Sequence, residues 1–308
     1  MKTMKKRFLG LVAGVMALVS VFTLTACGGF NPDKNITVVA REASSGTREA
    51  FDKIVTDGTT KLIDAELVKT ANIQNKTGAV LSTVQEDPQA IGYVSLGSVD
   101  DSVKTVKVEG VEPSVETVKN HTYKIQRPFV VITKQGIELS ARTADFVKFL
   151  KSSQMKDVCD ADGVIFLEDE AERANAGKTA IPVGTFEKLS ELPAGEKIVI
   201  RGSTSMEKVI NGAAKAYAKL YAVKPETLFD IQLEGSSKGI KAAESDTNGN
   251  VIGLSSAAVN KDGLESFNLC LDAVAVIVNK ENNIVEELSV NQLYAIYTGA
   301  ITKFSQLK

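Results

Sequence analysis

The sequence predicts an α/β protein whose strands form mainly parallel sheets. Segments with the composition of strands alternate with amphipathic helical segments along most of the chain. Three of the strand-to-helix connections consist largely of serine, threonine and glycine. In open α/β sheets, ligands bind beyond the carboxyl ends of the strands, so these three turns predict one shared binding site. A hydrophobic fraction of 44% and a charged fraction of 24% are typical of a globular protein that folds unaided.

The first 26 residues have the pattern of an export signal. Four cations at positions 2–7 precede an apolar stretch at 8–24 that ends in small residues, which favours a secretory signal over a membrane span. Its end, Leu24-Thr25-Ala26-Cys27, is similar to the lipobox of bacterial lipoproteins, whose cysteine is acylated and becomes the first mature residue. We therefore expect a lipid such as palmitate on Cys27 and a flexible tether over 27–35. A non-lipidated signal with a chance cysteine is the alternative.

The charge of the exported chain excludes a nucleic-acid partner. Removing residues 1–26 removes four of 36 cations and none of 38 carboxylates, so the formal charge falls from −2 to −6. Nucleic-acid binding requires a basic face. An anionic ligand would therefore be held by local donors and a buried arginine. Cys159 and Cys270 lack metal-ligand spacing and are interpreted as buried thiols, with a disulfide as the alternative.

The first half of the chain contains four predicted strands, each associated with a helix or turn. The segment 103–108 alternates apolar and polar residues with a period of two, as a half-exposed strand does. Continuous apolar runs at 90–96 and 129–133 are typical of buried strands. The full set comprises strands at 36–39, 90–96, 103–108 and 129–133, and helices at 51–55, 78–84, 115–118 and 144–150.

The second half of the chain has the same alternation of strands and helices, after a connection at 168–195. This connection is acidic and alanine-rich and then rich in proline and glycine, which predicts a surface segment with about one helical turn. Beyond it, the patterns predict strands at 197–200, 229–233, 250–256 and 271–278, and helices at 206–221, from Ile240, and at 290–296.

The three turns offer the groups that bind oxyanions. In the first, Arg41 precedes Ser45-Gly46-Thr47; the second spans 201–205 and the third 235–239. A helix N-terminus presents free backbone N–H groups and a positive dipole end. Hydroxyl groups add donors, and arginine adds a fixed charge with a fork of N–H groups. A serine-capped turn without a ligand is the alternative for any one of them.

These segments resemble the phosphate-binding component of bacterial phosphate ABC importers. The resemblance covers nearly all of the mature chain and rests on these segments: 36–48, 77–80, 90–97, 127–129, 198–205, 235–239, 252–256, 271–279 and 297–302. It implies a periplasmic-binding-protein-like α/β fold with two lobes joined by a hinge. It also implies a monomeric, non-enzymatic protein without cofactor or metal. Such a protein, anchored on the outer face of the cell membrane, captures inorganic phosphate and delivers it to the ABC permease subunits.

The order of the segments differs from that of the family and indicates a circular permutation. Segments matching the second part of the family's chain come first here, and 168–195 joins the family's old end to its old start. Permutation is tolerated when the ends lie close together and the cut falls in an exposed loop. We expect a discontinuous lobe of 36–126 plus 269–308 and a continuous lobe of 127–268.

The resemblance also assigns candidate phosphate-binding residues. The matching positions are Arg41, Ser45, Gly46, Thr47, Thr204, Ser205 and Ser236. Ser256 stands where some family members carry an aspartate that accepts the proton of monohydrogen phosphate, and Ala257 stands where others carry an arginine. Asp272 is the candidate replacement acceptor, with a helix cap or surface carboxylate as the alternative. Glu42 and Arg48 are expected to be solvated, with pairing to neighbours of Arg41 as the alternative.

Three other functions stay open at this point. The ligand could be another tetrahedral oxyanion, such as sulfate or molybdate. A secreted phosphatase could use a serine of these turns, although no histidine lies near one in the sequence. A lipoprotein could sense phosphate or bind a partner without transport.

Overall fold

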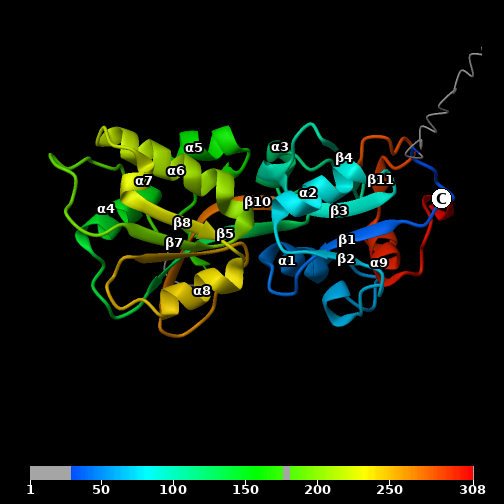
Figure 1. The fold of residues 1–308 in the computed structure, drawn as a ribbon, viewed down its shortest axis with the longest axis horizontal. Coiled ribbons are helices and arrows are strands. Elements are labelled where there is room, and N and C mark those ends of the chain that lie inside the picture. Colours follow the sequence, from blue (N-terminus) through cyan, green and yellow to red (C-terminus); the bar gives the residue numbers. More distant parts are fainter. Residues whose placement is uncertain (1–28, 176–180, 308) are drawn as a thin grey trace, which may run out of the picture.

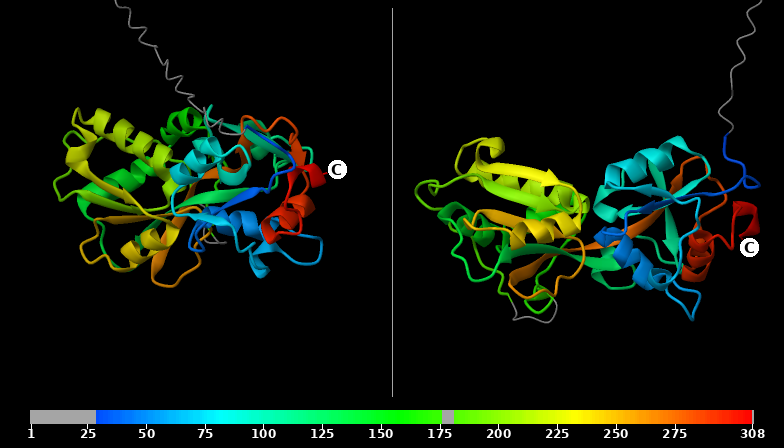
Figure 2. Two further views of the ribbon diagram at one scale, coloured as in Figure 1. Left: turned by 45° about the vertical axis from the view of Figure 1, so that its right-hand side comes forward. Right: turned by 60° about the horizontal axis from the view of Figure 1, so that its bottom comes forward.

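The computed structural model describes residues 29–175 and 181–307, which form two lobes side by side (Figure 1). The export signal and Cys27 lie outside the described residues. Figure 2 shows the narrow waist between the lobes. None of the described helices is long and apolar enough to cross a membrane.

Lobe A is a sheet with helices on both faces. Its strand β1 (Thr37–Arg41) lies between β2 (Asn72–Gln74) and β3 (Ala90–Ser95) and is parallel to both. Alternate residues of β1 point to opposite faces: Val38 and Ala40 pack with Phe51 of α1, whereas Val39 packs with α2. The remaining elements are α1 (Gly46–Ile54), η1 (Leu62–Asp64), α2 (Thr77–Glu86), η2 (Leu96–Ser98), β4 (Val103–Val108), α3 (Val115–Lys119), β11 (Glu287–Leu288), α9 (Val290–Thr298) and η5 (Phe304–Gln306).

Lobe B repeats this layered arrangement. Its strand β7 (Ile198–Gly202) is parallel to both β8 (Phe229–Leu233) and β9 (Val251–Ser255). The aromatic rings of Phe146, Phe149 and Tyr217 pack together over one face of the sheet. The remaining elements are α4 (Ala141–Leu150), α5 (Met155–Asp162), β6 (Ile165–Phe166), η4 (Thr204–Met206), α6 (Glu207–Leu220), α7 (Pro225–Leu228) and α8 (Ser236–Glu244).

Two long antiparallel strands cross between the lobes. They are β5 (Gln126–Lys134) and β10 (Leu264–Asn279). The residues of β10 up to Ala273 pair with β5, whereas Val274 to Val278 pair with β3 and Val276 to Asn279 pair with β4 on the other side. The strand order β2-β1-β3-β10-β5-β9-β7-β8 therefore runs through both lobes. The lobe boundaries expected from the sequence, near 126 and 269, fall in these strands.

Most predicted elements are present, and the differences have physical causes. The outer strands of each lobe are parallel, whereas the two crossover strands are antiparallel to their neighbours: β10 to β3, β4, β5 and β6, and β5 to β9. Strand β10 also begins at Leu264 rather than at 271. Helix α8 begins at Ser236, earlier than Ile240, because Gly235 adopts a φ of 116° that allows the sharp turn before the helix. Helix α5 was not predicted.

The connection at 168–195 is partly internal, which corrects the expectation of a surface segment. Arg173 and Asn175 are fully buried. Arg173 Nη2 donates to the Lys151 carbonyl oxygen at 2.9 Å, and Asn175 Nδ2 donates to the Val259 carbonyl oxygen at 2.6 Å. These bonds attach the connection to lobe B. Cys159 and Cys270 are buried free thiols, as interpreted from the sequence.

The two ends of the described chain meet at the outer end of lobe A (Figure 1). The backbone N–H of Ile36 donates to the Thr302 carbonyl oxygen at 2.8 Å, and the rings of Phe30 and Phe304 lie 5.6 Å apart. Neighbouring ends satisfy the geometric requirement for a permuted chain. The permutation itself stays a prediction.

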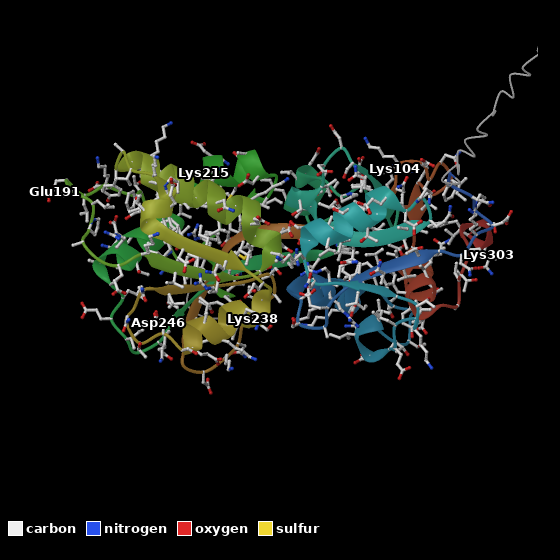
Figure 3. All side chains as sticks on the ribbon, in the orientation of Figure 1. Lys104, Glu191, Lys215, Lys238, Asp246 and Lys303 are labelled. Atoms are coloured by element: carbon white, nitrogen blue, oxygen red, sulfur yellow. The ribbon has the colours of Figure 1, made fainter. Side chains whose placement is uncertain are left out.

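A buried ion pair joins the crossover strands to each other and to lobe A. Asp272 lies opposite Arg127 in the β5–β10 ladder, and its Oδ2 accepts from Arg127 Nε at 3.0 Å and Nη2 at 2.9 Å. Asp272 Oδ1 accepts from Ser95 Oγ of lobe A at 2.8 Å. Burial raises the pKa of Asp272 and lowers the pKa of Arg127. By contrast, charged side chains such as Lys215 project from the outer surface (Figure 3).

Replacing Asp272 by asparagine is expected to lower the free energy of unfolding by roughly 3–5 kcal/mol, because Arg127 is left as an unpaired buried charge. Urea denaturation measures this loss. The matched control is Asp230→Asn, which breaks the more exposed ion pair with Arg201 and is expected to cost about 1 kcal/mol or less. Equal small losses in both variants would contradict a structural role for the buried pair.

Candidate functional site

Polar side chains of both lobes meet where the strand-to-helix turns face each other. Arg41 is the last residue of β1 and only 2% exposed. Its Nη1 donates to Thr77 Oγ1 of lobe A at 3.3 Å, and its Nη2 donates to Thr204 Oγ1 of lobe B at 3.3 Å. The guanidinium therefore contacts hydroxyl groups of both lobes.

Glu42 neutralises the charge of Arg41. Its two carboxylate oxygens accept from Arg41 Nε and Nη2, each at 2.9 Å. This two-bond geometry is the strong form of an arginine–carboxylate pair. The expectation that Glu42 is solvated is therefore wrong: burying Arg41 requires a partner for its charge, and the next residue supplies it.

The first turn is held in shape by its own side chains. Ser45 caps α1, and its Oγ accepts from the backbone N–H groups of Thr47 and Arg48 at 3.2 and 3.4 Å. Arg48 donates to the Arg41 carbonyl oxygen at 3.2 Å and pairs with Asp52 at 3.0 Å. The expectation that Arg48 is solvated is also wrong, because this side chain ties α1 to the end of β1.

The turns of lobe B supply a set of buried hydroxyl groups. Thr204 and Ser205 lie in η4, directly after β7, and Ser205 Oγ is 2.8 Å from Thr47 Oγ1 across the lobes. Behind them, Ser256 Oγ lies 2.8 Å from Ser203 Oγ and 3.3 Å from Ser236 Oγ. Each of these hydroxyl groups can donate one hydrogen bond and accept others.

Gly46 allows the two lobes to touch. A Cβ atom added to Gly46 would lie 2.7 Å from both the carbonyl carbon and Oγ of Ser256. Real side chains essentially never approach so closely, so any other residue would push the first turn away from lobe B.

The structure brings together eight of the nine residues predicted from the sequence. We call this group the cradle: Arg41, Ser45, Gly46, Thr47, Thr204, Ser205, Ser236 and Ser256. The ninth, Asp272, instead bonds Arg127 of the neighbouring crossover strand and Ser95 of lobe A. Its role as a proton acceptor for phosphate stays a prediction.

Two residues at the cradle were not assigned from the sequence. Ser203 precedes the Thr204-Ser205 pair and bonds Ser256. Thr77 begins α2 and contacts Arg41. The segment 77–80 stood out as part of the family resemblance, but its sequence gave no sign that Thr77 lies beside Arg41.

The cradle combines one cation with several hydroxyl donors in a buried setting, which suits a tetrahedral oxyanion. It is less suited to a metal ion. In the part of the chain that the structure describes, no group of histidine, cysteine, aspartate or glutamate could hold one. His121 is exposed and lies near Gln126 and Glu172, not at the cradle.

Comparisons with known proteins show the family of the chain. A model of the PBP superfamily domain matches residues 23–154 and 187–308. The chain is 33% identical to the phosphate-binding protein PstS 2 of Streptococcus agalactiae over 314 residues, covering 98% of this chain and 99% of that protein. It is 34% identical to PstS 2 of Streptococcus pneumoniae over 303 residues, covering 94% and 96%.

A solved structure supports the two-lobed fold. It is a phosphate-binding protein of a phosphate ABC transporter from Streptococcus pneumoniae, with a TM-score of 0.61 and 35% identity, covering 89% of this chain and 100% of that chain. Together with the superfamily match, it confirms the predicted fold class.

Proposed function

The chain belongs to the PBP superfamily and, within it, to the family of PstS phosphate-binding proteins, and we propose that it captures inorganic phosphate between its lobes and delivers it to the membrane subunits of an ABC importer. The observation that carries the proposal is the buried Arg41, which contacts hydroxyl groups of both lobes. The protein acts as a monomeric, non-enzymatic binding protein.

The cradle has enough donors for tight binding. Hydrogen bonds to a charged partner contribute about 1.5–3 kcal/mol each. A micromolar site needs only about 8 kcal/mol of net binding free energy. Several such bonds are therefore sufficient even after the costs of ordering and desolvation.

Selectivity for phosphate depends on acceptors as well as donors. Monohydrogen phosphate carries a proton that must be accepted, whereas sulfate has none to offer. The carboxylate nearest to Arg41 is that of Glu42, which bonds it directly. Hydroxyl oxygens of the cradle, Ser256 among them, are further acceptors. Isothermal titrations with sulfate and molybdate test whether the cradle prefers another oxyanion.

Binding is coupled to closure of the lobes around the two crossover strands. Contacts that cross the interface involve Gly46, Thr47 and Arg41 in lobe A and Ser256, Ser205 and Thr204 in lobe B. These contacts form only when the lobes approach, so phosphate held by both sides favours the closed form.

We further propose that the protein is exported and anchored by acylated Cys27. The described chain starts at the end of lobe A that is remote from lobe B (Figure 1). A tether at this end leaves the cleft between the lobes unobstructed. The membrane anchor and the extracytoplasmic location rest on the sequence pattern of residues 1–27.

Replacing Arg41 by alanine is expected to weaken phosphate binding by about a hundredfold or more, because it removes the only cation of the cradle and several charge-assisted bonds. Isothermal titration of the mature chain with phosphate at pH 7 measures this. The control Arg41→Lys keeps the positive charge but loses the fork of N–H groups. Its affinity for phosphate should lie between those of the wild type and Arg41→Ala. A wild-type preference for sulfate, or unchanged binding by Arg41→Ala, would contradict the proposal.

The variant Gly46→Ala is expected to bind phosphate about tenfold more weakly or worse, because its methyl group overlaps the Ser256 backbone and prevents closure. The same titration measures the loss, with circular dichroism to verify folding. The control is Gly78→Ala in α2, where an added Cβ has no atom within 4 Å. Equal affinities of both variants would show that this contact is not needed for binding.

A further inference from the structure

We propose that Thr77 is a further phosphate-binding residue, whose hydroxyl group donates to the anion while it orients Arg41. The inference rests on the proposed function of the cradle. It adds the start of α2 to the three turns and the end of β9, which already form the cradle.

Thr77 is held rigidly beside the cradle. It is the first residue of α2 and only 5% exposed. The same helix packs into the core of lobe A through Val80 and Val84, which are fully buried against β1 and β3. A side chain on a packed helix is positioned more precisely than one on a loop.

The Thr77 hydroxyl lies among three predicted binding groups. Its Oγ1 is 3.3 Å from Arg41 Nη1, 3.2 Å from Thr204 Oγ1 and 3.4 Å from Ser205 Oγ. The contact between Thr47 and Ser205 is shorter, at 2.8 Å. Hydroxyl hydrogen bonds are strongest near 2.7–2.8 Å, so the bonds of Thr77 to its neighbours are weak ones.

The direction of the Arg41 contact determines what Thr77 can do. Arginine can only donate, so Thr77 Oγ1 must accept from Arg41 Nη1. The single hydroxyl proton of Thr77 then points elsewhere, toward Thr204, Ser205 or an anion bound beside Arg41. An anionic oxygen is the strongest acceptor of the three.

The small exposed part of Thr77 faces the junction of the lobes. Two cavities of about 500 and 440 Å³ lie along the junction of the lobes, and Thr77, Gly78 and Thr204 line both. Thr77 therefore contacts Arg41 and also lines these two cavities. An anion that reaches Arg41 from these cavities passes the Thr77 hydroxyl group.

The test compares Thr77→Val, which keeps the shape but removes the hydroxyl group, with Thr77→Ser, which keeps the hydroxyl group. In titrations of the mature protein with inorganic phosphate, we expect about tenfold or greater weakening for Thr77→Val and no more than about threefold for Thr77→Ser. Thermal unfolding without phosphate checks that both variants are folded.

A matched control comes from the same helix. Thr83 Oγ1 donates to the Ala79 carbonyl oxygen at 2.8 Å, away from the cradle, so Thr83→Val should bind phosphate like the wild type. Wild-type affinity of Thr77→Val, equal weakening by both Thr77 variants, or equal weakening by Thr83→Val would overturn the inference. Failure of the wild type to bind phosphate would instead overturn the proposed function.

Discussion

The structure depends on keeping the charge of Arg41 buried at the junction of two lobes. A buried guanidinium is stable only when its charge is paired and its donors are bonded. The carboxylate of Glu42 provides the opposite charge, and the hydroxyl oxygens of Thr77 and Thr204 accept hydrogen bonds from the two terminal nitrogens of Arg41. Because Thr204 belongs to the other lobe, satisfying this one side chain also draws the lobes together.

The two crossover strands join the lobes at a fixed place, beside the junction where Arg41 is buried. The crossover strands β5 and β10 pair along much of their length, and the Arg127–Asp272 pair ties them to Ser95 of lobe A. The crossover strands are therefore held firmly together. At the cradle, small residues allow the two lobes to come into contact. Gly46 and Ser256 are close enough that a methyl group would separate them. The interface thus combines a fixed crossover with a tight, polar contact surface.

The local features of the fold and the cradle could be predicted from the sequence, whereas features set by packing could not. Ser45-Gly46-Thr47 and Thr204-Ser205 lie within a few residues of the end of a strand, so their place at the carboxyl edge of a sheet is encoded by neighbouring residues. The pairing of Glu42 with Arg41 was missed because it depends on how deeply Arg41 is buried. Thr77 meets Thr204 only across the lobes, 127 residues apart in the sequence. The antiparallel course of β10 likewise follows from its place between the lobes.

The most direct measurement is a crystal structure of the mature protein grown with inorganic phosphate. We expect one phosphate between the lobes, within hydrogen-bonding distance of Arg41 and of at least one hydroxyl group from each lobe, such as Thr47 and Ser205. Phosphate bound outside the cradle, or held by one lobe alone, would contradict this expectation.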